Sequence, residues 1–344
     1  MNTQIVRISD KTEYSEQLKA AAEIILSGGL VVFPTETVYG LGGNGLLADA
    51  AQKIYAAKGR PSDNPLIIHI AEPKDAENYA HVSDIYYRLA EAFMPGPLTV
   101  IMPKKDCIPL SVTGGLNTVA VRCPSHTIAH ALIEQCGVPI AAPSANLSGK
   151  PSPTSAKYVL EDMLGRVDMI IDGGECDIGL ESTIVSIDGD TLVLLRPGAV
   201  TYDALCCVCD KVDIAPAVTN KLAENERPLS PGMKYRHYAP QADFVLLEGN
   251  EDDVLEFMKS EQSQNGCAVL CYSEELEHLD PALSINIGGK DDLATQAKKL
   301  FSSLREADKL GAPKIYAHLP TLDGLGLALY NRMIRAAAHT IKKI

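Results

Sequence analysis

"KGRPSDNPLIIHI" (residues 58–70) joins two cations, a proline-bounded turn and an apolar strand. The stretch before it, "ADAAQKIYAAKG" (48–59), has the apolar spacing of a helix and ends at a glycine. "PLIIHI" (65–70) continues as a buried strand. This helix–turn–strand unit predicts an α/β fold that holds Lys58 and Arg60 at the turn.

Helix and strand patterns alternate on both sides of this unit up to about residue 200. The predicted helices cover 14–29, 84–96, 126–137 and 154–165, and the predicted strands cover 30–33, 97–103, 118–124, 138–143, 167–172, 182–188 and 191–198. The last three strands follow one another without an intervening helix. Residues 1–210 are therefore predicted to form a domain around a large, twisted, partly antiparallel sheet.

The pattern changes after residue 210. Residues 211–242 show little periodicity and many Pro, Asn and charged residues, which predicts an interdomain linker. Its "SPGMKYRHYAP" (230–240) is rich in groups that bind ligands. Residues 243–344 return to alternating strands and helices, which predicts a smaller Rossmann-like α/β domain.

Composition excludes several classes of protein. The 344 residues carry a formal net charge of −13, no Trp and 5% aromatic residues, which argues against a general nucleic-acid coat or a base-stacking platform. No apolar stretch is long enough to cross a bilayer, and the N-terminus lacks a secretory layout. Nine scattered cysteines favour the reducing cytoplasm. The group Cys206, Cys207 and Cys209 lacks paired C-x-x-C spacing and is interpreted as a helix end rather than a zinc site.

"GLGGNG" (40–45) matches the dinucleotide-binding spacing G-x-G-x-x-G. That interpretation requires the glycines to form the turn directly after a strand, but "PTETVYG" lies between them and the strand at 30–33. A plain flexible loop is preferred here to NAD binding.

Small polar and cationic residues recur where predicted strands end. Each of these residues also has an interpretation that involves no ligand. Lys58 and Arg60 fit a solvated helix end, and Ser144 and Asn146 fit a loop that caps a helix. Together they form the pattern expected of a cleft that binds a small anion. The residues concerned are Thr35, Lys58, Arg60, Arg122, Ser144, Asn146, Ser182 and Arg196, with His69 either in the core or in the cleft.

Seven ordered motifs give these groups a common context. They are "PTETVYGLG", "KGRPSDNPL", "PGPLTV", "TVAVRCP", "APSANLSGKPSPT", "ESTIV" and "LRPGA". Their order and spacing over residues 10–205 resemble the YrdC-like domain of the threonylcarbamoyl-AMP synthase family. The linker and the last domain resemble the long two-domain form of that family.

The resemblance implies a reaction in which L-threonine, bicarbonate and ATP give L-threonylcarbamoyl-AMP, pyrophosphate and water. The ATP is expected to carry Mg²⁺, with few protein ligands to the metal. The product is expected to serve the threonylcarbamoyladenosine modification of tRNA, with other proteins making the transfer.

The resemblance also implies residue roles. The family signature falls on Lys58, Arg60, Ser144 and Asn146 as catalytic residues. The threonine-binding positions are Thr35, His69, Arg122, Ala142 and Ser182. The ATP-binding positions are Lys58, Ser62, Thr118, Ser144, Ser152, Arg196 and, from the linker, Tyr235.

Two alternatives remain open from the sequence. One is a carbamoyl-adenylate-forming maturation enzyme, which shares the YrdC-like domain but normally carries C-x-x-C pairs. The other is a double-stranded RNA-binding module, although the acidic total predicts at most weak RNA contact. The linker is expected to close the cleft as a lid that excludes water from a labile carbamate.

Overall fold

The computed structural model describes residues 2–8, 15–220 and 238–344. The chain divides into two compact units, which are described separately below. The first unit comprises Met1–Ser148, Pro153–Asp177 and Glu181–Lys234, and the second comprises Gly149–Ser152, Ile178–Leu180 and Tyr235–Ile344. Among the helices of the described ranges, none combines the length and the apolar content that a bilayer crossing requires.

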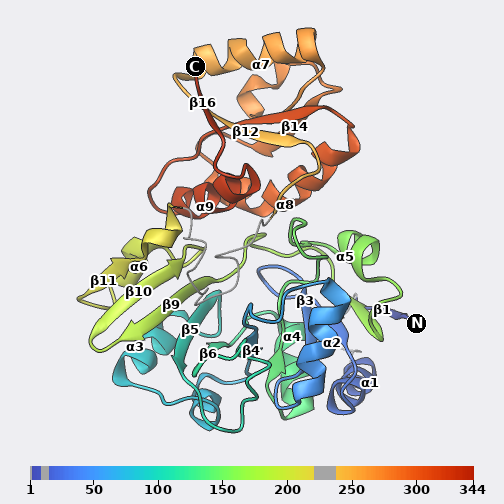
Figure 1. Ribbon diagram of the computed structural model, residues 1–344, viewed down its shortest axis with the longest axis vertical. Coiled ribbons are helices and arrows are strands. Elements are labelled where there is room, and N and C mark those ends of the chain that lie inside the picture. Colours follow the sequence, from blue (N-terminus) through green and yellow to red (C-terminus); the bar gives the residue numbers. More distant parts are fainter. Residues whose placement is uncertain (1, 9–14, 221–237) are drawn as a thin grey trace. The chain divides into compact units, whose positions relative to one another are not determined.

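The first unit is a large mixed sheet with helices packed against it (Figure 1). Its helices are α1 (Ser15–Leu26), α2 (Ala48–Lys58), η1 (Pro73–Asn78), α3 (Asp84–Phe93), α4 (Thr127–Cys136), α5 (Ala156–Met163), α6 (Tyr202–Cys206) and η2 (Pro216–Val218). Its strands are β1 (Gln4–Arg7), β2 (Val31–Phe33), β3 (Gly40–Asn44), β4 (Ile67–His69), β5 (Leu98–Pro103), β6 (Thr118–Arg122), β7 (Ile140–Ala141), β8 (Met169–Asp172), β9 (Thr183–Asp188), β10 (Thr191–Arg196) and β11 (Val212–Ile214).

The eleven strands are ordered β1-β8-β2-β3-β7-β4-β6-β5-β9-β10-β11. Parallel pairs such as β4 with β6 stand beside antiparallel pairs such as β5 with β6 and β9 with β10. The predicted partly antiparallel α/β sheet is therefore confirmed. The sheet also includes β1 and β11, which the sequence patterns did not predict as strands.

The apolar faces of α1 and α4 form one core with β2, β7 and β8. The residues that carry this core are Leu18, Ala22 and Ile25 from α1, Ala129 and Leu132 from α4, and Val31, Ile140 and Met169 from the strands. Burial of these side chains supplies the main drive to hold the helices on the sheet.

The interpretation of "GLGGNG" as a flexible loop is wrong, because Gly40–Asn44 is the buried strand β3. A Cβ at Gly42 would lie 2.7 Å from Cε1 of Phe33 and 2.8 Å from Cγ2 of Ile140. The glycine is required because neighbouring side chains occupy the space that a Cβ would fill. The motif thus serves strand packing rather than the turn of a dinucleotide site.

Replacing Gly42 with Ala is expected to lower the free energy of unfolding by about 1–3 kcal/mol, because the added methyl overpacks the core. Gly40→Ala on the same strand is the matched control, since its Cβ would meet nothing closer than 3.3 Å. Urea unfolding of both variants measures the difference. Equal losses in the two variants would contradict the packing explanation.

The second unit holds a parallel sheet of five strands ordered β14-β13-β15-β12-β16. The strands are β12 (Asp243–Glu248), β13 (Ala268–Tyr272), β14 (Ser284–Gly288), β15 (Lys314–His318) and β16 (Ile341–Lys343). The helices are α7 (Glu251–Asn265), η3 (Ser273–His278), α8 (Leu293–Lys309) and α9 (Gly326–Ala336). Val254 and Met258 of α7 pack on alternate residues of the sheet such as Val245 and Val269, while α8 and α9 lie on its other side (Figure 1). The predicted Rossmann-like arrangement is confirmed.

Candidate active site

The C-terminus of α2 and the turn after it hold the two cations of the opening motif. Gly59 adopts the left-handed conformation (φ 62°) and ends the helix after Lys58. Arg60 lies just past this cap, and its Nη2 donates to the carbonyl of Pro65 at 3.0 Å. The hydroxyl of Tyr55 donates to the carbonyl of Asn64 at 3.1 Å. The hydrogen bonds of Tyr55 in the helix and of the Arg60 guanidinium thereby hold the proline-bounded turn in place.

Lys58 connects this turn to the loop that carries Ser144 and Asn146. Its Nζ donates to the carbonyl oxygens of Ser144 at 2.5 Å and Asn146 at 2.6 Å, and to Oδ1 of Asn146 at 3.2 Å. Oγ of Ser144 donates to the same Oδ1 at 2.5 Å. The backbone N–H of Ser148 donates back to the carbonyl of Lys58 at 2.9 Å. The two signature motifs, 86 residues apart in the chain, are therefore in direct contact.

A row of side chains that are polar except for Ile184 crosses the middle of the sheet. The pairing registers place His69 of β4 beside Arg122 of β6, Arg122 beside Thr99 of β5, Thr99 beside Ile184 of β9, and Ile184 beside Arg196 of β10. Laterally paired residues project from the same face of a sheet. Three residues predicted to bind substrate thus share one face, although they come from strands far apart in the sequence.

Arg122 is paired with a buried carboxylate. Its Nη2 donates to Oε1 of Glu36 at 2.6 Å, and only 5% and 7% of the two side chains are exposed. Burial acts to raise the pKa of Glu36, but the charge and hydrogen bond of Arg122 and the backbone N–H groups of Glu36 and Ser125 outweigh it, so the pKa lies below 4.5. The stability that this ion pair adds is therefore present above about pH 4.5 and is lost as the pH falls through the lowered pKa.

His69 is buried as a neutral ring. Its Nδ1 donates to the carbonyl of Ile140 at 3.3 Å, and the ring of Phe33 stands edge-on to it at 6.2 Å. Burial, and then the positive charge of Arg122, lower the pKa of His69 to about 3. At neutral pH this side chain therefore offers a hydrogen bond and no charge.

The unfolded chain binds a proton at His69 below about pH 6.5, whereas the folded chain does so only near pH 3. The contribution of this group to stability is thus complete above pH 6.5, and we expect it to fall by about 2–3 kcal/mol between pH 6.5 and pH 4.5. His69→Asn should remove this part of the acid dependence in urea unfolding. The exposed His81, changed to Gln, is the control and should keep the wild-type dependence. An unchanged dependence in His69→Asn would contradict this assignment.

Ser182 links Arg196 to the same region. Its Oγ lies 2.8 Å from Oγ1 of Thr99 and accepts from Nη2 of Arg196 at 3.1 Å. Nε of Arg196 also donates to the carbonyl of Ser182 at 3.0 Å. The guanidinium of Arg196 therefore holds the start of β9 in place. Arg196 also belongs to the row of side chains that crosses the sheet.

The other predicted residues are distributed as follows. The hydroxyl of Thr35 is buried and donates to the carbonyl of Val38 at 2.6 Å, inside its own loop. The backbone N–H of Ala142 donates to the carbonyl of Ile67 at 2.9 Å. Ser62 is exposed on the turn that follows α2. Ser152 belongs to the second unit, and Tyr235 lies outside the described residues, so their predicted contacts stay predictions.

Strand β6 relates the two groups of side chains. Thr118, Ala120 and Arg122 alternate onto one face of it, about 13 Å from end to end. Ala120 pairs with Ile67, which puts the Lys58–Ser144 contact toward the Thr118 end and the Arg122–Glu36 pair at the other end. The Lys58–Ser144 contact and the Arg122–Glu36 ion pair thus lie toward opposite ends of β6.

Metal-ligating side chains do not gather in the described ranges, where no group of three or more His, Cys, Asp or Glu residues is placed to hold an ion. Oε1 of the Glu36 carboxylate is held by Arg122. Mg²⁺ enters the account only as part of the ATP substrate.

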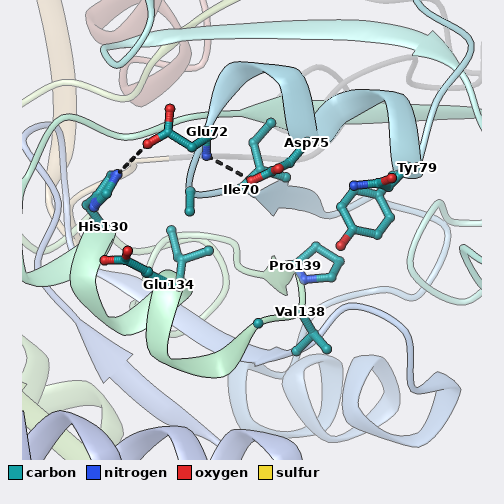
Figure 2. Close-up of a pocket in the computed structure, with 12 residues that line it drawn as sticks. Ile70, Glu72, Asp75, Tyr79, His130, Glu134, Val138 and Pro139 are labelled. Carbon is teal, nitrogen blue, oxygen red and sulfur yellow. Dashed lines mark hydrogen bonds and ion pairs between the residues drawn. The ribbon is translucent and has the colours of Figure 1, made fainter.

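A separate cavity of about 310 Å³ lies between η1 and α4 (Figure 2). Apolar side chains such as Ile133 and Val138 line it together with Glu72, His130 and Glu134. Nε2 of His130 lies 3.6 Å from Oε1 of Glu72. None of the predicted site residues lines this cavity, so it is distinct from the candidate active site.

Known proteins match the chain over its whole length. The family model described as "Telomere recombination" matches residues 23–198, and that described as "Threonylcarbamoyl-AMP synthase, C-terminal domain" matches residues 200–338. The threonylcarbamoyl-AMP synthase of Pyrococcus abyssi is 43% identical over 99% of this chain and 100% of its own length. The chain belongs to the threonylcarbamoyl-AMP synthase family. The Bacillus subtilis member is 42% identical over 98% of this chain and 97% of its own length.

A solved structure agrees with this assignment. The crystal structure of P. abyssi Sua5 complexed with L-threonine superposes with a TM-score of 0.92, at 43% identity, over 99% of this chain and 100% of that one. The predicted family, fold class and synthase activity are confirmed by these full-length matches. The individual site residues and the boundaries at 210 and 242 stay predictions.

Two participants were missed from the sequence. Glu36 stands next to the predicted Thr35, but the sequence patterns assign it no role. Thr99 falls within a predicted apolar strand and is likewise assigned no role. The sequence does contain a signal for Glu36. Arg122 places a positive charge at the end of a buried strand, and such a charge requires a partner of opposite sign. No comparable signal marks Thr99, since its contact with Ser182 depends on the pairing of β5 with β9.

Proposed function

We propose that this chain makes L-threonylcarbamoyl-AMP from L-threonine, bicarbonate and ATP between the two ends of β6 in its first unit. The observation that carries the proposal is the bonding of Lys58 to the Ser144–Asn146 loop toward one end of β6, with the Arg122–Glu36 pair toward the other end. Two separated cationic groups suit two anionic substrate parts, the carboxylate of an amino acid and the phosphates of a nucleotide.

Threonine is assigned to the Arg122 end. The planar guanidinium is suited to a carboxylate, and the neutral His69 beside it carries no charge that would compete with it, because its single N–H donates to the carbonyl of Ile140. The threonine-binding residues in this proposal are Thr35, His69, Arg122, Ser182 and the backbone of Ala142. The likeness to a structure complexed with L-threonine supports this placement.

The nucleotide is assigned to the other end, with Mg²⁺ on its phosphates. Lys58, Arg60, Ser144 and Asn146 would bind the phosphates, where positive charge and small donors meet. The further nucleotide contacts in this proposal are Ser62, Thr118, Ser152, Arg196 and Tyr235.

The chemistry then needs alignment more than a protein nucleophile. The threonine amine and bicarbonate form a carbamate with loss of water. A carbamate oxygen attacks the α-phosphorus of ATP, the bond from the α-phosphorus to the bridging oxygen breaks, and pyrophosphate leaves. Cations near the phosphates stabilise the charge that develops there. The expected lid is a segment that lies mostly outside the described residues, so this role stays a prediction. In this proposal other proteins pass the threonylcarbamoyl group to tRNA.

Carbon-13 bicarbonate tests the proposal. With ATP and L-threonine, the purified chain should form threonylcarbamoyl-AMP that is heavier by one carbon-13, seen by mass spectrometry. A labelled carbamoyl adenylate without threonine would favour the maturation enzyme instead. A gel shift with double-stranded RNA, in the absence of any labelled adenylate, would favour the RNA-binding module.

A further inference from the structure

The Arg122–Glu36 pair contains two polar atoms that its own hydrogen bond does not use. Oε2 of Glu36 and Nε of Arg122 are buried and make no hydrogen bond of ordinary length and angle among the described residues, although the backbone N–H groups of Glu36 and Ser125 also stabilise the carboxylate charge. The two residues are 5% and 4% exposed. The pair therefore presents one unfilled acceptor on its anion and one unfilled donor on its cation.

Such atoms are unfavourable when they stay empty. A buried polar group without a partner loses its hydration and gains nothing in return, and the loss is greater for charged groups. Native proteins usually fill such positions with water, an ion or a ligand. The two atoms thus mark a place where a polar guest is expected.

The chemistry of the two atoms selects the guest. The empty N–H on the cation requires an acceptor, preferably an anion, and the empty oxygen on the anion requires a donor, preferably a cation. An α-amino acid carries a carboxylate and an ammonium group on the same carbon. Its zwitterion complements the ion pair at both atoms without leaving a net charge buried.

The neighbouring groups are less suited to the ammonium. The hydroxyl of Thr35 already donates to the carbonyl of Val38 at 2.6 Å. The ring of His69 donates through Nδ1 to the carbonyl of Ile140 at 3.3 Å. Neither group carries a negative charge, whereas Glu36 does.

We infer that Glu36 binds the α-ammonium group of threonine through Oε2, while its Oε1 holds Arg122 on the carboxylate. This inference rests on the proposed function, which assigns the carboxylate to Arg122. It adds a substrate-binding residue that selects amino acids over the corresponding hydroxy acids. Threonine is thereby recognised at three groups: carboxylate, ammonium and side chain.

Calorimetric titration of the full chain with two ligands tests the inference. The ligands are L-threonine and 2,3-dihydroxybutanoate of matching configuration, in which a hydroxyl replaces the amine. The wild-type chain should bind threonine about 10- to 100-fold more tightly, the ratio expected of one hydrogen bond between charged groups. In Glu36→Gln this preference should fall by about tenfold or more.

The ratio separates a direct contact from a structural role. If Glu36 only orients Arg122, Glu36→Gln weakens both ligands equally and the preference remains, which would overturn the inference. If water alone fills the site, neither affinity changes, which would also overturn it. Glu72→Gln, at the distinct cavity of Figure 2, is the matched control and should leave both affinities unchanged.

Three further outcomes are decisive. If Glu36→Gln does not fold, equal affinity of the wild-type chain for the two ligands overturns the inference. If the wild-type chain forms labelled threonylcarbamoyl-AMP but its preference is insensitive to Glu36→Gln, the inference fails while the proposed function stands. If it forms no product and binds no threonine, both fail.

Discussion

Lys58→Met should reduce threonylcarbamoyl-AMP formation by about 10²- to 10³-fold, the loss typical when one buried donor to a developing charge is removed. The lysine is 3% exposed, and its Nζ holds three oxygens of the loop that carries the other half of the signature. Its removal takes away the cation and also the contact that positions Ser144 and Asn146. Initial rates at saturating threonine and ATP measure the effect.

Lys53→Met on the same helix is the matched control. Its Nζ donates to the carbonyl of Gly28 at 2.6 Å, but it lies on the exposed side of α2, away from the signature loop. This variant should keep nearly the full rate. Circular dichroism establishes that both variants are folded. A folded Lys58→Met enzyme with a wild-type rate would contradict the assigned role of Lys58.

Arg122→Met should lower the free energy of unfolding by about 3–5 kcal/mol, because it leaves the carboxylate of Glu36 buried without its cation. Threonine binding should be lost together with stability. Urea unfolding at pH 7 and calorimetric titration measure the two effects.

The double variant Glu36→Gln/Arg122→Met separates the ion pair from general packing. We expect it to be more stable than Arg122→Met alone by about 1–3 kcal/mol, since no uncompensated charge remains. Lys211→Met is the control, because it breaks the exposed pair with Asp190 and should leave the unfolding transition in place. A double variant no more stable than Arg122→Met would show that the charge of Glu36 is not the cause.

The sequence predicted the framework of the site because its signals are local. Apolar periodicity located most helices and strands, and Gly59 with its flanking prolines located the turn that carries Lys58 and Arg60. The ordered motifs then assigned the Ser144–Asn146 loop and this turn to one site, and the hydrogen bonds of Lys58 join the two.

What could not be predicted depends on pairing between distant strands. The glycines of β3 resembled a loop because a buried strand usually shows branched apolar residues, whereas Phe33 and Ile140 fill this space from neighbouring strands. The partnership of Arg122 with Glu36 spans 86 residues, and no local pattern identifies which acid will reach which base. The edge strands β1 and β16 are short and largely exposed, so they carry little apolar signal.

The most direct test of the central claim is pyrophosphate release by the purified chain, with threonine and bicarbonate omitted in turn. We expect pyrophosphate release from ATP only when both are present, and we expect this release to be lost in Lys58→Met and Arg122→Met but not in Lys53→Met. Pyrophosphate release that continues at the same rate without threonine would contradict it.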